Sequence, residues 1–354
     1  MQPGRREFLA QAAIAAAGYA LLGAARTPGT VADDELESPS PPAGRGWGWD
    51  LTSRRPLPQP LSASGEGRKT GQQARTRIIL LGTKGGPSLG KLRSNPATLL
   101  VINEIPYLID CGYGVSRQLV SAGIALDRLR YIFITHHHSD HDLEYGPLLY
   151  NAWAAKNSPR VDAYGPAGLK QMTANFFRYM KFDIETRISD EGLKDPRKLV
   201  TVHEFYRGGP VMRNDDVRVT SLRVRHPPIK QSYAYRFDAK DRSIVLSGDT
   251  AYAPEVAEFA KGADVLIHEV MYLPAIEKLI KQFPGAARLR EHLLASHTGA
   301  ADVGRIARQA GVKTLVLTHF VPGDDPTITD DQWIEEVRKN FEGRIIVGKD
   351  LMEI

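Results

Sequence analysis

Cysteine is almost absent from this sequence. Cys111 is the only one among 354 residues, which excludes an intramolecular disulfide and a zinc site made of cysteine pairs. It follows the apolar segment Leu108 to Ile109 and an aspartate, and this setting predicts a buried, unreactive thiol. Disulfide staples and cysteine clusters therefore play no part in the expected fold or site.

A dense basic stripe is also missing. The chain has 46 Lys and Arg against 41 Asp and Glu, a formal net charge of +5 and a pI of about 9.1. The basic residues are not interleaved with aromatics as on a nucleic-acid surface. The charge therefore permits a small anionic substrate, and we expect no stable nucleic-acid partner. No internal repeat is visible. The hydrophobic fraction of 42% and charged fraction of 25% are ordinary globular values that allow a sizeable core. A homodimer is compatible with this composition.

The pattern of residues 1–26 predicts a signal peptide. The pair Arg5-Arg6, followed by Phe-Leu, precedes an Ala-rich run from about Ala10 to Ala25, the basic, apolar and small-residue order of such peptides. The paired arginines resemble a twin-arginine signal. A cytosolic chain with a helical N-terminus is the alternative; a spanning helix is disfavoured because the run is short and rich in Ala and Gly. We expect export by the twin-arginine machinery to the periplasm or beyond.

Residues 27–75 are rich in Pro, Gly, Ser and charge. Such a stretch buries too little apolar surface to fold alone, so it is interpreted as a disordered linker. Trp47 and Trp49 lie within it, with their role left open. We expect one folded domain over residues 76–354.

Strands and helices alternate through residues 76–354, which predicts an α/β fold. The expected helices cover residues 115–122, 145–155, 169–180 and 273–283, with two more around 303–310 and 333–341. Residues 183–199 are polar and are expected to be irregular. The apolar stripe of 273–283 is interpreted as core packing rather than the wall of a ligand pocket.

The rest of the chain is organised around Tyr131 to His141, which reads YIFITHHHSDH. An apolar, β-rich run ends in four histidines and an aspartate, and the carboxyl ends of strands are where α/β sheets keep their sites. Alternation along an extended backbone turns His136 and His138 to one side, and Asp140 follows on a turn. A surface chelating tract or a polar loop is the alternative. Imidazole and carboxylate in this spacing favour a site for zinc or a similar divalent metal.

Three later residues each close an apolar strand. His226 ends SLRVRH, Asp249 ends SIVLSGD and His319 ends TLVLTH. Taken singly, each residue could cap a turn, which is the commoner role. Three in succession, together with the histidine cluster, predict one composite metal site.

These motifs resemble the metallo-β-lactamase superfamily over residues 77–354. The resemblance implies a four-layer αβ/βα sandwich and two divalent ions, with Zn2+ expected and Mn or Fe as alternatives. It assigns His136, His138 and His226 to one ion, and Asp140, His141 and His319 to the other, with Asp249 bridging. Cations bridged in this way lie roughly 3.5–4 Å apart and activate a shared hydroxide as nucleophile.

Two departures narrow the branch within this superfamily. Class B β-lactamases commonly carry cysteine where Asp249 stands, and flavodiiron oxygen reductases carry glutamate where His138 stands, so both activities are disfavoured. The segments LGTKGG, LIDCG, YGPAG, SGDT, HEV, SHTGA and LTHF resemble the ribonuclease Z and arylsulfatase-like branch.

The same resemblance suggests catalytic residues beyond the metal ligands. His297 in SHTGA and Glu269 in HEV are similar to a His and Glu that assist phosphodiester cleavage in ribonuclease Z, where a carboxylate orients the imidazole for proton transfer. Asp140 would help orient the hydroxide. The alternative is that His297 caps a helix starting near Thr298. The remaining histidines are interpreted as structural or exposed: His203, His268 and His292.

The expected function is therefore an exported dinuclear hydrolase that uses a metal-bridging hydroxide to cleave a small phosphodiester or sulfate ester. A lactonase or another small-ester hydrolase, such as a guanitoxin-pathway type, is one alternative. A ribonuclease Z-like nuclease is disfavoured, because the segment between Tyr235 and Ser247 is too short for the long basic arm expected there. A non-catalytic periplasmic metal-binding protein would use the same ligands.

Overall fold

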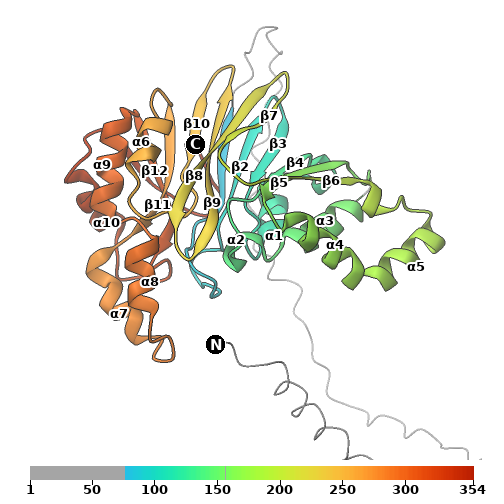
Figure 1. Ribbon diagram of the computed structural model, residues 1–354, viewed down its shortest axis with the longest axis horizontal. Coiled ribbons are helices and arrows are strands. Elements are labelled where there is room, and N and C mark those ends of the chain that lie inside the picture. The colour runs from blue at the N-terminus through green and yellow to red at the C-terminus, as the bar shows by residue number, and fades with distance from the viewer. Residues whose placement is uncertain (1–75, 156) are drawn as a thin grey trace, which may run out of the picture. The chain divides into compact units, whose positions relative to one another are not determined.

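The computed structural model describes residues 76–155 and 157–354. The expected signal peptide and linker lie outside these residues. In the described part, the strands form two seven-stranded sheets that pack face to face, with helices on their outer sides (Figure 1). None of the described helices combines the length and apolar character that a membrane span requires.

The first sheet carries the histidine-rich segment. It has the order β14-β1-β2-β3-β4-β5-β6, and β4 lies in its interior with parallel neighbours on both sides. Its strands are β1 (Arg77–Gly82), β2 (Ala97–Ile102), β3 (Ile105–Ile109), β4 (Tyr131–Phe133), β5 (Val161–Pro166), β6 (Val200–Phe205) and β14 (Met352–Glu353). The carboxyl ends of β3 and β4 therefore open at the same edge.

The second sheet has the order β13-β12-β11-β10-β9-β8-β7. Its strands β10, β11, β12 and β13 are parallel, so their carboxyl ends also meet at one edge. Its strands are β7 (Gly209–Arg213), β8 (Val217–His226), β9 (Ile229–Ala239), β10 (Ser243–Leu246), β11 (Val265–Met271), β12 (Thr314–Val321) and β13 (Arg344–Val347).

Helices cover the outer face of each sheet and complete the four layers. The α-helices are α1 (Val115–Ser121), α2 (Ser139–Asp142), α3 (Tyr145–Trp153), α4 (Leu169–Tyr179), α5 (Lys181–Glu191), α6 (Pro254–Phe259), α7 (Ile276–Lys281), α8 (Leu289–Ser296), α9 (Ala300–Ala310) and α10 (Asp330–Arg338). Short 3-10 helices span Leu126–Arg128, Pro196–Lys198 and Leu273–Ala275. One apolar cluster joins α1, α3 and α4 to the first sheet, and another joins α6, α9 and α10 to the second. The predicted αβ/βα sandwich is confirmed.

The core between the sheets is aromatic. Phe133 of β4 makes edge-to-face contacts with Tyr235 and Phe237 of β9, at ring-centroid distances of 5.6 and 5.1 Å. Such pairs add to the free energy gained by burying the rings. They fix β4 directly over β9, so the histidines that follow β4 are held against the second sheet.

Two sequence-based expectations were wrong. Residues 183–191, part of the stretch 183–199 that was expected to be irregular, belong to α5, where Arg187 pairs with Asp183 and Glu191 at helical spacing. Such pairs support a helix of little apolar character. The expected helix at 273–283 is a 3-10 turn followed by the shorter α7, and Phe283 lies beyond its end. The last helix, α10, begins after Thr329, which forms a capping box with Gln332.

Candidate metal centre

The histidine cluster starts where β4 ends. Beyond Phe133 the chain runs without a regular element to His138, the extended N-cap residue of α2, and α2 then carries Asp140 and His141. The side chains of His136, Asp140 and His141 are buried, and that of His138 is partly buried. The second sheet and the loop after β10 contribute the buried side chains of His226, Asp249 and His319. The structure thus brings all seven predicted ligand residues to the adjoining edges of the two sheets.

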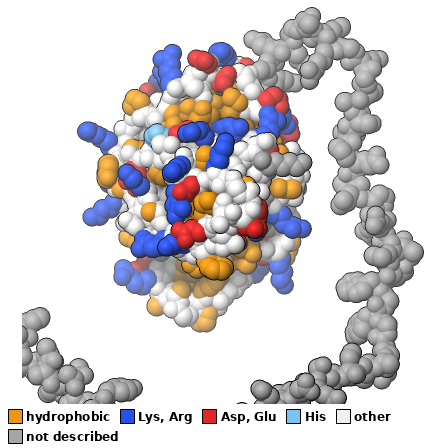
Figure 2. Space-filling view, turned by 90° about the vertical axis from the view of Figure 1, so that its right-hand side faces the viewer, with side chains coloured by type: hydrophobic (Ala, Val, Ile, Leu, Met, Phe, Trp, Pro, Cys, Tyr) orange, Lys and Arg blue, Asp and Glu red, His pale blue; other side chains and the backbone are white. Residues whose placement is uncertain are grey.

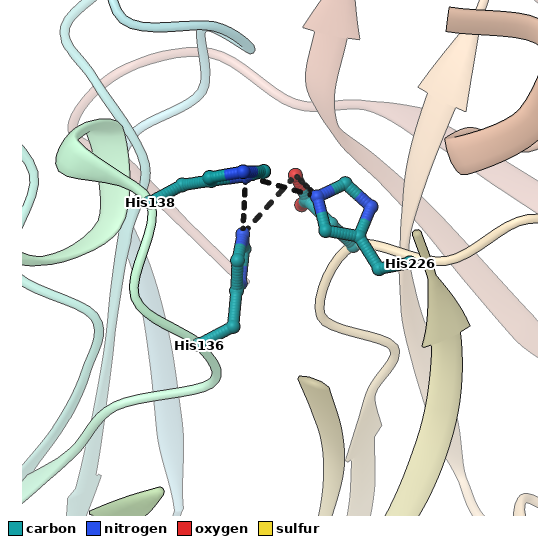
Figure 3. A group of neighbouring side chains, drawn as sticks. His136, His138 and His226 are labelled. Carbon is teal, nitrogen blue, oxygen red and sulfur yellow. Dashed lines mark hydrogen bonds and ion pairs between the residues drawn. The ribbon is translucent and has the colours of Figure 1, made fainter. Parts of the chain in front are cut away.

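The first group of side chains contains three imidazoles. Nε2 of His136 and Nε2 of His226 each lie 3.0 Å from Nδ1 of His138, and Figure 3 shows the three rings pointing toward one another. Oδ2 of Asp249 lies 3.9 Å from the Nε2 atoms of His136 and His226. Nitrogen ligands about 2.0–2.1 Å from a tetrahedral Zn2+ are separated by about 3.3 Å, so this spacing fits one cation.

The second group shares Asp249 with the first. Oδ2 of Asp249 lies 3.0 Å from Nε2 of His319 and 3.3 Å from Nε2 of His141. Oδ2 of Asp140 lies 3.4 and 3.7 Å from the same two nitrogens. A single carboxylate thus belongs to two adjacent ligand sets, the arrangement needed for a bridging residue.

Several of these polar atoms make no hydrogen bond within the protein. Nε2 of His141, Nε2 of His319 and Oδ1 of Asp249 are buried without a hydrogen bond. Buried polar groups are almost always satisfied, so the orphaned atoms indicate that a ligand belongs between them. Imidazole and carboxylate donors without sulfur fit Zn2+ and also Mn or Fe, and the residues present fit a pair of divalent cations.

Electrostatics differ between the two groups. Burial lowers the pKa of His226 to about 4, which leaves the neutral imidazole that metal binding requires. Burial also disfavours the charged form of His319, but Asp249 and Asp140 outweigh it and raise the pKa of His319 to about 10. The second group therefore concentrates negative charge and attracts positive charge to the point where its ligand atoms meet.

Outer hydrogen bonds orient the ligand rings. Oδ2 of Asp110 accepts from Nδ1 of His141 at 2.8 Å, and the same carboxylate accepts from the backbone N–H and the hydroxyl of Thr135. Nδ1 of His226 donates to the carbonyl of Ser296 at 2.9 Å. Holding Nδ1 in this way directs Nε2 inward. Asp110 was missed in the sequence, although it closes an apolar strand as Asp249 does.

Gly85 makes room for His319. A Cβ at Gly85 would lie 2.7 Å from the imidazole of His319, a separation that real side chains do not tolerate. His319 itself has a φ of 47°, a left-handed backbone conformation that costs energy for a non-glycine residue. The close approach and the backbone strain both place the ring of His319 at the centre.

His297 and Glu269 form a buried pair beside the second group. Nδ1 of His297 lies 3.1 Å from Oε2 of Glu269, whose Oε1 accepts from the backbone N–H of Thr250 at 3.0 Å. The ring of His297 stacks on His319 at a centroid distance of 5.5 Å. The next helix, α9, has Gly299 as its N-cap. The alternative in which His297 caps this helix therefore does not describe its contacts.

A cavity of about 710 Å³ opens over the centre and is lined by His138, Asp140, Asp249, His297 and His319. His292, expected to be structural or exposed, also lines it, with its ring centroid 6.2 Å from that of His138. Nothing in the sequence around His292 distinguished it from a surface histidine. Of the other two histidines in that expectation, His268 is buried and its Nδ1 donates to the carbonyl of Glu269, and His203 pairs with Asp162 on the surface.

Known proteins resemble this chain in sequence and in fold. The β-lactamase superfamily domain model matches residues 106–320. Ribonuclease Z of Mycobacterium bovis is 31% identical over 281 residues, which are 78% of this chain and 97% of that protein. Ribonuclease Z of Mycobacterium marinum is 32% identical with the same coverage.

Solved structures share the fold at lower identity. The metallo-β-lactamase fold protein YhfI from Bacillus subtilis superposes with a TM-score of 0.59 at 22% identity, covering 79% of this chain and 99% of that one. The short form of human tRNase Z gives a TM-score of 0.56 at 22% identity, covering 78% and 98%. The chain therefore belongs to the metallo-β-lactamase superfamily and is a hydrolase of that fold with ribonuclease Z-like homologues.

Proposed function

We propose that this protein is a dinuclear metal-dependent hydrolase that cleaves a small phosphodiester or sulfate ester. The observation that carries the proposal is the position of Asp249, which belongs to both ligand groups while the Glu269–His297 pair lies beside the second group. Two ligand sets and an oriented imidazole at the base of one cavity are the parts that hydrolysis of a stable ester requires.

The ligand residues divide between two cations. His136, His138 and His226 would hold one cation and Asp140, His141 and His319 the other, with Asp249 between them. Zn2+ is the expected ion, and Mn or Fe fits the same nitrogen and oxygen donors. When bound, the two cations activate water and neutralise the charge that develops on the ester oxygens.

The chain itself supplies orientation and a proton. Oδ2 of Asp140 accepts from the backbone N–H of Gly86 at 2.8 Å, which fixes the carboxylate that would orient the attacking water. Nδ1 of His297 is engaged by Glu269, so Nε2 is the atom that delivers a proton. As the oxygen of water bonds to phosphorus or sulfur, the bond to the leaving-group oxygen breaks and His297 protonates that oxygen.

A ribonuclease Z-like nuclease is the second candidate, favoured by the 31% identity over nearly the full length of the mycobacterial protein. Against it, the segment between Tyr235 and Ser247, where such a protein would carry its basic arm, consists of the end of β9, the short connection 240–242 and β10. The face seen in Figure 2 also has its Lys and Arg side chains spread among acidic and apolar ones. Both observations favour the small substrate.

A substrate panel combined with elemental analysis tests the proposal. Purified protein should contain about two metal ions per chain and should turn over bis(4-nitrophenyl) phosphate or 4-nitrophenyl sulfate. Turnover of a lactone alone would move the assignment to the lactonase alternative, and rapid cleavage of unstructured RNA would favour the nuclease. A metal-loaded protein that turns over none of these substrates would be a binding protein, and the proposal would be wrong.

Export belongs to the same proposal. It rests on Arg5-Arg6 and the Ala-rich run after them, which lie outside the described residues. A full-length chain expressed in a bacterium with a twin-arginine pathway should appear in the periplasmic fraction or the medium. Replacing Arg5 and Arg6 by Lys should retain it in the cytoplasm, and an unchanged distribution would contradict the export signal.

A further inference from the structure

One wall of the cavity over the centre is apolar. It is built by α7, α8 and the turn between them, which project from the second sheet on the side of α9 and α10 in Figure 1. The apolar side chains that line the cavity from this hairpin are Leu279, Phe283, Ala286, Leu289 and Leu293. Val321 of β12 extends this wall, and Leu89 adds an apolar side chain from the segment after β1. The apolar stripe of residues 273–283, expected to pack in the core, thus partly faces a cavity.

Part of this apolar surface is open to solvent. Phe283 is 42% exposed and Leu89 is 63% exposed, whereas Leu293 is buried beneath the hairpin with Ile276 and Val321. Exposed apolar side chains grouped around a cavity of about 710 Å³ are typical of small-molecule sites, in which apolar walls hold the ligand and a few polar groups fix its orientation.

The cations that line the same cavity are already engaged. Among the described lining residues these cations are Lys84 and Lys278. Nζ of Lys84 donates to the carbonyls of Gly85 and Gly86 and to the hydroxyl of Ser88, at 3.0, 3.2 and 3.1 Å, which uses all three donors of an ammonium group. Nζ of Lys278 donates to Asp325 at 2.7 Å and to Thr327 at 3.1 Å.

Carboxylates balance the lysines of the rim. Asp324 and Asp325 both line the cavity; Asp325 is paired with Lys278, and Asp324 accepts from the backbone N–H groups of Lys91 and Leu92. A chain of phosphates would meet the Asp324 carboxylate with little free positive charge to offset it. The cavity therefore suits a ligand whose charge is confined to the group that reaches the metal centre.

We infer that the substrate carries a bulky apolar group, aryl or alkyl, which packs against the wall formed by Leu279, Phe283 and Leu289 while its single ester group reaches the metal centre. This inference deepens the proposed function and depends on it for the assignment of an ester as the reacting group. It assigns the α7–α8 hairpin the role of selecting the substrate by the size of its apolar part.

Binding of phosphonates with one constant headgroup tests this inference without relying on turnover. Methyl-, butyl-, octyl- and phenylphosphonate are titrated into metal-loaded protein by calorimetry. Burying the tail against the apolar wall should tighten Kd by up to about fourfold per added methylene. A Kd that is the same for methyl- and octylphosphonate would overturn the inference.

Variants connect the tail preference to the wall. The double substitution Leu279→Ala/Phe283→Ala should remove most of the preference for octyl over methyl, with the Kd of methylphosphonate unchanged. Phe182→Ala is the matched control, because Phe182 is 86% exposed on α5 and does not line the cavity, and it should keep the full preference. A preference that survives in the double variant would contradict the assignment to this wall.

The proposed function is tested by a different measurement, the turnover of esters. Tail-dependent binding without turnover of any ester in the panel would reject the hydrolase and leave the apolar subsite standing. Turnover with tail-independent binding would reject only the apolar subsite.

Discussion

Asp110 holds His141 in place: its Oδ2 lies 2.8 Å from Nδ1 of the imidazole, and the contact is buried. Asp110 has a φ of 63°, a left-handed backbone conformation that is energetically unfavourable for a residue other than glycine. This conformation presents the carboxylate to His141. The ring is thereby fixed with Nε2 directed at Asp140 and Asp249. Asp110 belongs to neither ligand group and acts on the metal centre through His141.

Replacing Asp110 by Ala should weaken metal binding about 10- to 100-fold, because His141 loses the contact that orients its ring. Competition with a chromogenic chelator measures the affinity. Asp162→Ala is the matched control, since Asp162 makes the same 2.8 Å contact with His203 on the surface and should leave metal affinity unchanged. Equal affinities for both variants would show that Asp110 is not needed to orient the ligand.

Replacing Asp249 by Ala should remove at least one metal ion per chain, because its carboxylate belongs to both ligand groups. Elemental analysis of the purified variant checks this. Asp190→Ala removes an exposed carboxylate from α5 and should retain both ions. Full metal retention by the Asp249 variant would rule out the bridging assignment.

His297→Ala should keep both metals and lower the rate with poor leaving groups by about 10²- to 10⁴-fold, the usual contribution of a positioned proton donor. Nitrophenyl esters need little protonation of the leaving oxygen, so their rates should fall much less. Comparing alkyl and nitrophenyl esters of the same acid measures this split. If both rates fell equally, His297 would have another role, such as supporting the stacked ring of His319.

Gly85→Ala should disturb the second ligand group, because the added Cβ would lie 2.7 Å from the ring of His319. We expect loss of the metal held by the second ligand group and a large drop in activity with the fold retained, checked by metal content and circular dichroism. Gly285→Ala is the control, since a Cβ there meets nothing within 4 Å. Wild-type metal content in the Gly85 variant would mean that His319 can move aside without loss of its ligand role.

The positions of the ligand residues could be predicted because each lies at or near the end of an apolar strand. Hydrophobic runs ending in His or Asp identify strand ends, and the parallel strands β10 and β12 carry Asp249 and His319 to one edge, although β12 continues past His319 to Val321. His226 reaches the same edge because β8 and β10 both pair with β9 in antiparallel orientation and so run in the same direction. Asp110 gave the same signal at the end of β3 but was not marked by a histidine nearby.

The apolar wall and α5 could not be predicted in the same way. A stripe such as Leu279 to Phe283 has the same spacing whether it faces a core or a cavity, because periodicity reports one apolar face and not what covers it. His292 likewise reaches the cavity only through the direction of α8. Residues 181–191 owe their helix partly to charged pairs, which leave little hydrophobic periodicity to read.

The candidate centre draws its side chains from both sheets: His136, His138, Asp140 and His141 follow β4, whereas the opposite sheet supplies His226 at the end of β8, Asp249 after β10 and His319 within β12. Neither half of the sandwich therefore contains all the metal-ligating side chains. Cations bound there would link the two halves, and the free energy of metal binding would directly stabilise their association. If the chain were divided between β6 and β7, recovery of metal binding on mixing would report that the two pieces had found each other.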